Sequence, residues 1–121
     1  MAWTEDNFGN KGARQFLQMQ VTRLMTTIHD IIHNPERLAP DDDGESMLMP
    51  CIEVLALLCE RYDVAPPKLD VIQHWHRSYL QAFDQGFDDM NPPPGLKARR
   101  RRVIDNTFHW LESLSESYYA E

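Results

Sequence analysis

The stretch SMLMPCIEVLALLCERY, residues 46–62, is the most apolar part of the chain, and it decides the fold. When this stretch is wound into a helix, apolar side chains occupy nearly every side of it. A helix of that kind is usually the central and most buried one of its domain. Pro50 is tolerated in the first turn of a helix and kinks a helix elsewhere. We therefore expect a central helix from about Ser46 to Tyr62, with Pro50 in its first turn or at a kink.

Three more amphipathic helices are predicted around this one, because prolines divide the chain into blocks. The first helix is expected to begin at Asn10, a residue type that caps helices, and to end at Asn34-Pro35. The other two follow Pro66-Pro67 and Pro92-Pro93-Pro94, and Gly86 is the expected end of the earlier one. In each of these three helices the residues of the buried stripe recur at helical spacing. They are Ala13, Phe16, Leu17, Val21, Leu24, Ile28, Ile31 and Ile32 in the first helix; Leu69, Ile72, Trp75, Tyr79, Ala82 and Phe83 in the helix after Pro66-Pro67; and Val103, Thr107, Phe108, Leu111, Leu114 and Tyr118 in the last helix.

The pattern predicts a helical domain without a sheet. No segment alternates apolar and polar residues as a half-buried strand does. Residues 41–45 are strongly polar and are expected to form a loop between the first two helices. Four amphipathic helices with short connections favour a compact antiparallel bundle. The prediction is an all-α fold over residues 1–121, a single domain and a compact bundle of about four helices with an anchored N-terminal segment.

The composition excludes several classes of protein. The chain has 121 residues, of which 42% are apolar and 10% aromatic, so it can bury a core and is not expected to be disordered. No stretch approaches the roughly 20 apolar residues that cross a bilayer, and residues 1–10 do not resemble a signal peptide. Cys51 and Cys59 lie eight residues apart in one predicted helix, a span of about 12 Å that a disulfide cannot bridge. We therefore expect a cytoplasmic protein with reduced thiols and no membrane contact.

The net charge of −7 is unevenly distributed. Lys97 and Arg99–Arg102 supply five of the twelve basic residues, and seven basic against nineteen acidic residues remain elsewhere, a balance of −12. Such a surface repels nucleic acid and anionic lipid and attracts basic proteins. The basic run allows three interpretations: a solvated helix start, an ion-pair zone with neighbouring acids, or a nucleic-acid patch. Cations at a helix start oppose the helix dipole, so we expect something to compensate them.

The histidines give only weak signals for a metal site. His29 and His33 lie at i and i+4, as in zinc metalloproteases, but an aspartate replaces the usual glutamate and no third ligand is marked. His74 and His76 flank a core tryptophan and point in different directions, so they cannot easily share an ion, and His109 is interpreted in the same way. Phosphate-binding loops, nucleophile elbows and dinucleotide fingerprints do not occur in the sequence. We expect no enzyme activity, no cofactor and no metal.

Two groups of acids are the candidates for contact with a partner. Residues 41–45 lack the spacing of an EF-hand loop, which leaves a solvated loop or a surface for a basic partner. Residues 84–89 form a second acidic edge around Phe87, which is expected to be an exposed aromatic anchor. The candidate partner-binding residues are Asp41, Asp42, Asp43, Glu45, Asp84, Phe87, Asp88 and Asp89.

Glu53 is a further candidate, because it lies inside the most apolar stretch. A buried carboxylate is costly unless it is paired or hydrogen-bonded. We expect a structural salt bridge or a cap to a neighbouring helix or to the N-terminal segment. The alternative is that Glu53 faces a partner.

The opening of the chain resembles a bacterial family of uncharacterised proteins, the domain of unknown function 4259. The residues that carry the likeness are Ala2-Trp3-Thr4, Asn7-Phe8-Gly9-Asn10, Ala13 and Phe16. Glu53–Leu58 is similar to the second helix of that family, and Ile104–Trp110 is similar to its last helix. The chain departs from the family pattern at Thr4, where a glycine is usual, and at Lys11-Gly12, where an acidic pair is usual.

This resemblance implies an all-α fold without an assigned activity, in which Trp3, Phe8, Asn10 and Glu53 have structural roles. Small acidic bacterial domains of this kind often act as immunity proteins. The predicted function is therefore to bind a basic toxin domain of a secreted protein and to neutralise it by occlusion, the acidic surface steering the toxin and aromatic side chains holding it. The alternative is a non-catalytic adaptor or regulatory module that could form a dimer, and an exposed apolar patch would favour it. A metal enzyme and a nucleic-acid-binding protein are the weaker hypotheses.

Overall fold

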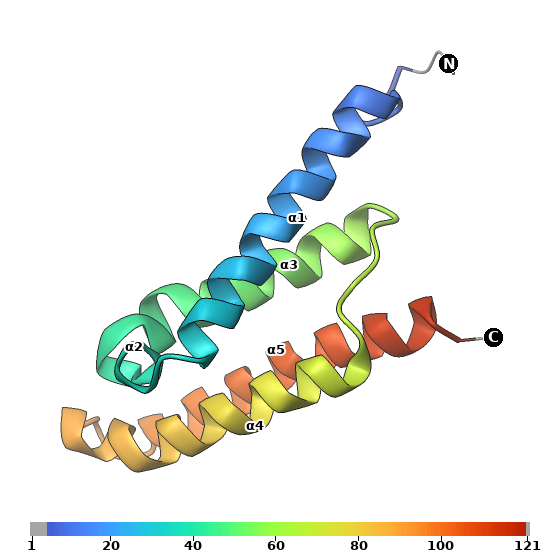
Figure 1. Ribbon diagram of the computed structural model, residues 1–121. Helices are drawn as coiled ribbons and strands as arrows, with labels where there is room; N and C mark the ends of the chain where they lie inside the picture. The colour runs from blue at the N-terminus through green and yellow to red at the C-terminus, as the bar shows by residue number, and fades with distance from the viewer. Residues whose placement is uncertain (1–4, 121) are drawn as a thin grey trace.

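The computed structural model describes residues 5–120, and every regular element in that part of the chain is a helix (Figure 1). The elements are α1 (Lys11–Ile32), α2 (Pro35–Leu38), η1 (Pro40–Leu48), α3 (Met49–Arg61), α4 (Leu69–Gly86), η2 (Phe87–Met90) and α5 (Leu96–Tyr118). The prediction of an all-α bundle is confirmed. Among these helices, none has the length and apolar character needed to span a bilayer.

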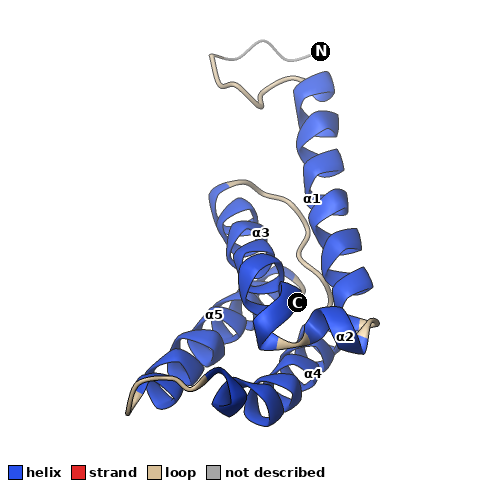
Figure 2. Ribbon diagram, turned by 90° about the vertical axis from the view of Figure 1, so that its left-hand side faces the viewer, coloured by secondary structure: helices blue, strands red, loops and turns tan. Residues whose placement is uncertain are grey.

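The helices pack in the order α1, α3, α5, α4. α4 and α5 form an antiparallel hairpin, α3 packs on α5, and α1 packs on α3 (Figures 1 and 2). η1 closes one end of this arrangement by contacting α2, α3 and α4. The first turns of α1 project beyond the other helices in both views.

The core is built largely from the predicted apolar stripes. Its most buried side chains are Val21, Ile28, Ile31, Leu48, Ile52, Leu55, Ile72, Tyr79, Phe83, Ile104, Phe108 and Leu111. Full burial of one large apolar side chain contributes about 1.5–3 kcal/mol. This layer therefore holds the helices together and fixes the positions of the polar residues at the edges.

The N-terminal segment is anchored on the bundle by contacts that agree with the prediction. The side chain of Asn10 caps α1 by accepting a hydrogen bond from the backbone N–H of Ala13, at 2.8 Å. The ring of Phe8 packs edge-on against Tyr62 after the end of α3, with ring centroids 4.8 Å apart. The predicted anchor Trp3 lies outside the described residues.

The helix α3 is less deeply buried than predicted. Pro50 lies in its first turn as expected, but Val54 and Leu57 are 43% and 49% exposed. The reason is that α1 and α5 flank α3 on two sides, and no described element covers its outer face. Phe16, predicted to lie in the apolar stripe of α1, is also exposed, whereas its neighbour Leu17 is buried, so the two side chains lie on different sides of the helix.

The prediction of a polar loop at residues 41–45 is wrong, because this segment belongs to η1. η1 is a wide helical segment with a kink at Asp42, where φ is −118° and ψ is −127°. Gly44 is buried, and a Cβ added to it would overlap the carbonyl oxygen of Leu38 and lie 2.6 Å from Cε1 of Tyr79. Only glycine permits so close an approach. The acidic segment is therefore a packed part of the fold.

Candidate functional site

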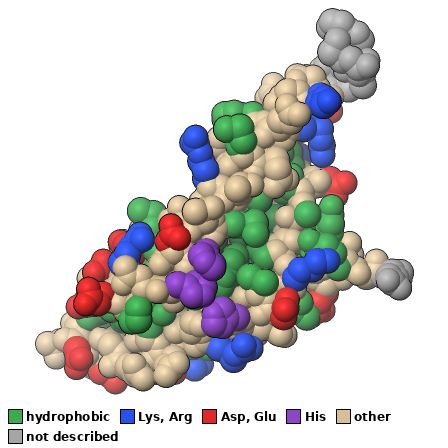
Figure 3. All heavy atoms as spheres, in the orientation of Figure 1, with side chains coloured by type: hydrophobic (Ala, Val, Ile, Leu, Met, Phe, Trp, Pro, Cys, Tyr) green, Lys and Arg blue, Asp and Glu red, His purple; other side chains and the backbone are tan. Residues whose placement is uncertain are grey.

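The two acidic segments predicted from the sequence lie at the same end of the molecule. η1 contacts both α4 and η2, and the ring of Pro40 packs against Gly86 at the end of α4. Figure 3 shows acidic side chains gathered toward this end. We call the surface formed by residues 41–45 and 84–89 the acidic end.

Glu45 is bound within the molecule. One of its oxygens accepts a hydrogen bond from Nε of Arg100 at 2.6 Å. The other accepts from the hydroxyl of Tyr79 at 2.6 Å and from Nη2 of Arg100 at 3.2 Å. Burial and the neighbouring Glu45 carboxylate raise the pKa of Tyr79, so its hydroxyl stays a donor. The Glu45 carboxylate joins η1, α4 and α5, and this structural role leaves it little capacity to bind a partner.

The basic run at the start of α5 compensates part of the acidic end. Nζ of Lys97 lies 2.9 Å from the carboxylate of Asp88, and Arg101 donates two hydrogen bonds of 3.1 Å to Asp84. The hydrogen bond from Arg101 lowers the pKa of Asp84, and the same bond raises the pKa of Arg101. The ion-pair interpretation of the basic run is thus the one that the structure supports, and these acids offset the unfavourable position of cations at a helix start.

The remaining acids of this end differ in their surroundings. Asp43 pairs with Arg37 at 2.7 Å. Asp41, Asp42 and Asp89 are exposed, and none of the ion pairs found within residues 5–120 includes them. The structure therefore brings all seven predicted acids to one end, but only these three carry charge that is not balanced by a contact of the chain itself.

The prediction that Phe87 is an exposed anchor is wrong. Its side chain is only 6% exposed, and its ring packs on that of Phe83 with centroids 4.5 Å apart. Phe87 follows Phe83 by four residues, so the helical turn η2 continues the buried face of α4. The exposed apolar residue at this edge is instead Met90.

Glu53 also departs from the expectation of burial. It lies on the exposed outer face of α3, beside Val54. Together with Arg100 and Val103 it borders a shallow groove of about 260 Å³ between α3 and α5. A carboxylate in this position is solvated and does not carry the cost of burial that the sequence suggested.

The histidines of α1 are exposed. The rings of His29 and His33 lie 4.1 Å apart, and Nδ1 of His33 donates to the carbonyl oxygen of His29 at 2.8 Å. The ring of His74 on α4 lies 6.0 Å from that of His33. Figure 3 shows histidine side chains gathered on one face of the molecule.

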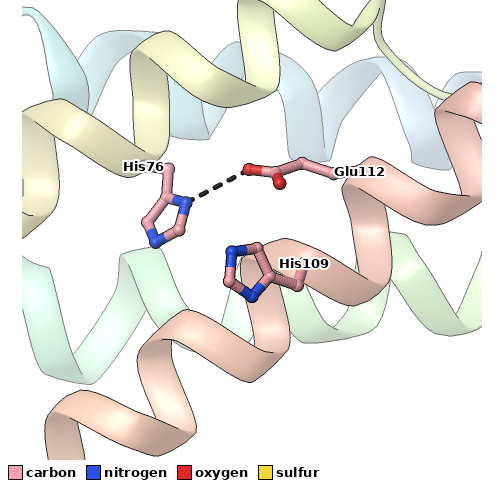
Figure 4. Close-up of side chains that lie close together, drawn as sticks. All are labelled: His76, His109 and Glu112. Atoms are coloured by element: carbon pink, nitrogen blue, oxygen red, sulfur yellow. Dashed lines mark hydrogen bonds and ion pairs between the residues drawn. The ribbon is translucent and has the colours of Figure 1, made fainter.

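His76 lies on the other side of α4, where it meets residues that sequence reasoning did not connect with it. Its Nε2 atom is 2.7 Å from Asp105, and its Nδ1 atom is 3.1 Å from Glu112. Figure 4 shows His109 beside His76 and Glu112, the three side chains facing one another across the contact between α4 and α5. The spacing of Asp105, His109 and Glu112 places all three on one face of α5, but no sequence signal shows that this face meets His76.

The two cysteines lack the features of catalytic nucleophiles. Cys51 and Cys59 are free thiols in α3, as expected. Burial raises the pKa of Cys51, and it raises the pKa of Cys59 to about 11. The thiolate is the reactive form, so both side chains are poor nucleophiles at neutral pH.

Comparison with protein-family models, with curated proteins and with solved structures gives no match for this chain. The resemblance stated for the opening of the chain thus stays a prediction. The contacts of Phe8 and Asn10 are structural, as that resemblance implies for these two residues. Fold and site together define an all-α domain with an acidic end.

Proposed function

We propose that this domain is a non-catalytic protein-binding module and, more specifically, an immunity protein that binds a basic toxin domain and blocks it by occlusion. The observation that carries the proposal is the acidic end, where Asp41, Asp42 and Asp89 are exposed and make no ion pair with a described residue. Exposed charges of one sign steer a partner of the opposite sign and speed its association.

The acidic end is also joined to the rest of the fold by contacts within the chain, which favours binding. Glu45 joins three helical elements, and the pairs of Lys97 and Arg101 fasten the end of α4 and η2 to α5. A preformed surface loses less conformational freedom when a partner binds than a mobile loop does. Met90, exposed in the same region, supplies an apolar contact at its edge.

A second candidate function, an adaptor or regulatory module that self-associates, is favoured by a separate observation. Val54 and Leu57 on α3 and Phe16 on α1 are exposed apolar side chains. A groove of about 240 Å³ runs between the two helices beside Leu24 and Leu58. Apolar surface of this kind is often an interaction site. A dimer in sedimentation equilibrium that Leu57→Glu dissociates supports this second function, whereas a monomer at high concentration supports the first.

The immunity function predicts that a neighbouring gene encodes a secreted protein with a toxic domain, and co-expression with that domain tests it. The helical domain is expected to restore growth and to co-purify with the toxin in a one-to-one complex. The triple variant Asp41→Asn, Asp42→Asn and Asp89→Asn should restore growth less well, because it removes the uncompensated charge without changing a buried contact. The proposal fails if the unaltered domain neither restores growth nor binds the toxin.

A matched control removes the same charge from the opposite end of the molecule. Glu60 lies in the last turn of α3, Asp63 follows that helix, and Glu116 lies near the end of α5, all three exposed and far from η1 and η2 along the helices (Figure 1). The triple variant Glu60→Gln, Asp63→Asn and Glu116→Gln should restore growth as the unaltered domain does. Equal losses in the two triple variants would mean that net charge, and not the acidic end, determines binding.

A further inference from the structure

The contact between α4 and α5 contains a group of ligand-type side chains that the proposed function does not use. His76 comes from α4, His109 and Glu112 come from α5, and their ligand atoms lie within 4.8 Å of one another. Within residues 5–120 this is the one group of three His, Cys, Asp or Glu side chains that meets this distance. In Figure 4 the three side chains point into the same space.

The ring of His76 is held in a fixed orientation. It stacks on the buried ring of Phe108, with centroids 4.6 Å apart and an angle of 11° between the planes. Its Nε2 atom lies 2.7 Å from a carboxylate oxygen of Asp105. A carboxylate bonded to the far nitrogen of a histidine is the usual support of a metal ligand, because it fixes the tautomer of the ring. In the tautomer that donates Nε2–H to Asp105, the lone pair of Nδ1 faces Glu112 and His109.

The Nδ1 atom of His76 is directed at a carboxylate oxygen. The Nδ1 atom lies 3.1 Å from Oε2 of Glu112, and an ionised carboxylate accepts hydrogen bonds but cannot donate them. Either a proton or a metal ion can bridge these two atoms. A proton accounts for the contact between Nδ1 of His76 and Oε2 of Glu112, but it does not explain why His109 lies beside them. Three donors that converge from two helices fit a metal ion instead.

We propose that His76, His109 and Glu112 bind one zinc-type divalent ion, with Asp105 orienting His76. Two imidazoles and one carboxylate form a ligand set that Zn²⁺ takes with water in its fourth position, whereas Mg²⁺ and Ca²⁺ prefer oxygen ligands. In a tetrahedral site with bonds of about 2.0–2.1 Å, two ligand atoms lie roughly 3.3 Å apart. The observed separation of Nδ1 and Oε2 is close to that value.

The surroundings of the three ligands suit ion entry and retention. His76 and Glu112 are largely buried, their side chains being 12% and 14% exposed, so they meet the ion in a partly desolvated place. His109 is exposed, so its ring is free to turn toward the ion and leaves a path from solvent. The inference is independent of the proposed function, since the ion joins α4 to α5 and does not lie at the acidic end.

The test is calorimetric titration of the chelator-treated full chain with zinc chloride. One ion is expected to bind per chain, and magnesium chloride is expected to give no binding heat. His109→Ala should weaken zinc binding at least about 10-fold, and Asp105→Asn should weaken it about 10- to 100-fold, the range found for residues that support a ligand. Glu112→Gln, which keeps the size of the side chain, should weaken it as well. Circular dichroism confirms that each variant is folded.

His29→Ala is the matched control for His109→Ala, because it removes an exposed histidine of another helix that lies outside the group. It should bind zinc as tightly as the unaltered chain. Nuclear magnetic resonance should show the ring signals of His76 and His109 shifting on zinc addition, and those of His29 staying in place. Lack of saturable zinc binding, or equal affinities of His109→Ala and the unaltered chain, would overturn the proposal.

Discussion

Gly44→Ala is expected to lower the free energy of unfolding by about 3 kcal/mol, the upper end of the usual cost of overpacking. The added Cβ would overlap the carbonyl oxygen of Leu38 and would lie 2.6 Å from Cε1 of Tyr79 and 2.9 Å from the carbonyl oxygen of Ala39. Two of these neighbours are backbone atoms and the third belongs to a fully buried ring, so none can move away cheaply. Denaturation by urea measures the loss directly.

Gly12→Ala is the control for this change, because it adds the same methyl group in open surroundings. The nearest atom to a Cβ at Gly12 is Oδ1 of Asn10, at 3.5 Å. Gly12 lies in the first turn of α1, where alanine favours the helix by up to about 1 kcal/mol. The two substitutions should therefore act in opposite directions. A Gly44→Ala protein as stable as the unaltered one would show that η1 is not packed as described.

Glu45→Ala is expected to lower the free energy of unfolding by about 2–3 kcal/mol. A buried hydroxyl that loses its acceptor costs about 1–3 kcal/mol, and this is the position of Tyr79 once the carboxylate is gone. Arg100 loses two charge-assisted hydrogen bonds as well. The side chains of Glu45 and Arg100 are 21% and 27% exposed, so water solvates part of the freed charge. The loss of unfolding free energy should thus stay below the roughly 3–5 kcal/mol that removing one partner of a fully buried ion pair costs.

A double-mutant cycle separates the hydrogen bond of Tyr79 from the rest of this effect. Tyr79→Phe removes the hydroxyl, and Glu45→Ala combined with Tyr79→Phe should cost less than the two single changes together. Asp41→Ala is the control within the same segment, and a change of less than about 0.5 kcal/mol is expected for this exposed residue. If Glu45→Ala proves as mild as Asp41→Ala, the carboxylate does not hold η1 in place.

The limits of the helices could be predicted from the sequence because they depend on local chemistry. Asn10 caps α1 with its own side chain, Pro50 lies in the first turn of α3, and α4 ends at Gly86. Each of these residues acts on backbone groups within one turn of itself. The burial of Phe87 could also have been predicted from the sequence, because its spacing of four residues from Phe83 continues the buried face of α4.

The contacts between distant residues could not be predicted in the same way. Arg100 lies 55 residues from Glu45, and Glu112 lies 36 residues from His76. Which residues meet depends on the order and rotation of the packed helices, and the sequence pattern gives only the face that each helix buries. The exposure of Leu57 has the same origin, because the apolar pattern of a helix does not determine how many neighbouring helices pack against it.

The sharpest test of the acidic end is the rate constant for association with the purified basic toxin domain, measured at low and high salt. The triple variant Asp41→Asn, Asp42→Asn and Asp89→Asn should associate about 10-fold more slowly at low salt and should lose most of the salt dependence, since these charges steer the encounter. The control triple variant at Glu60, Asp63 and Glu116 should keep the rate of the unaltered domain. Association that is equally fast, and equally sensitive to salt, with and without the three aspartates would contradict the account.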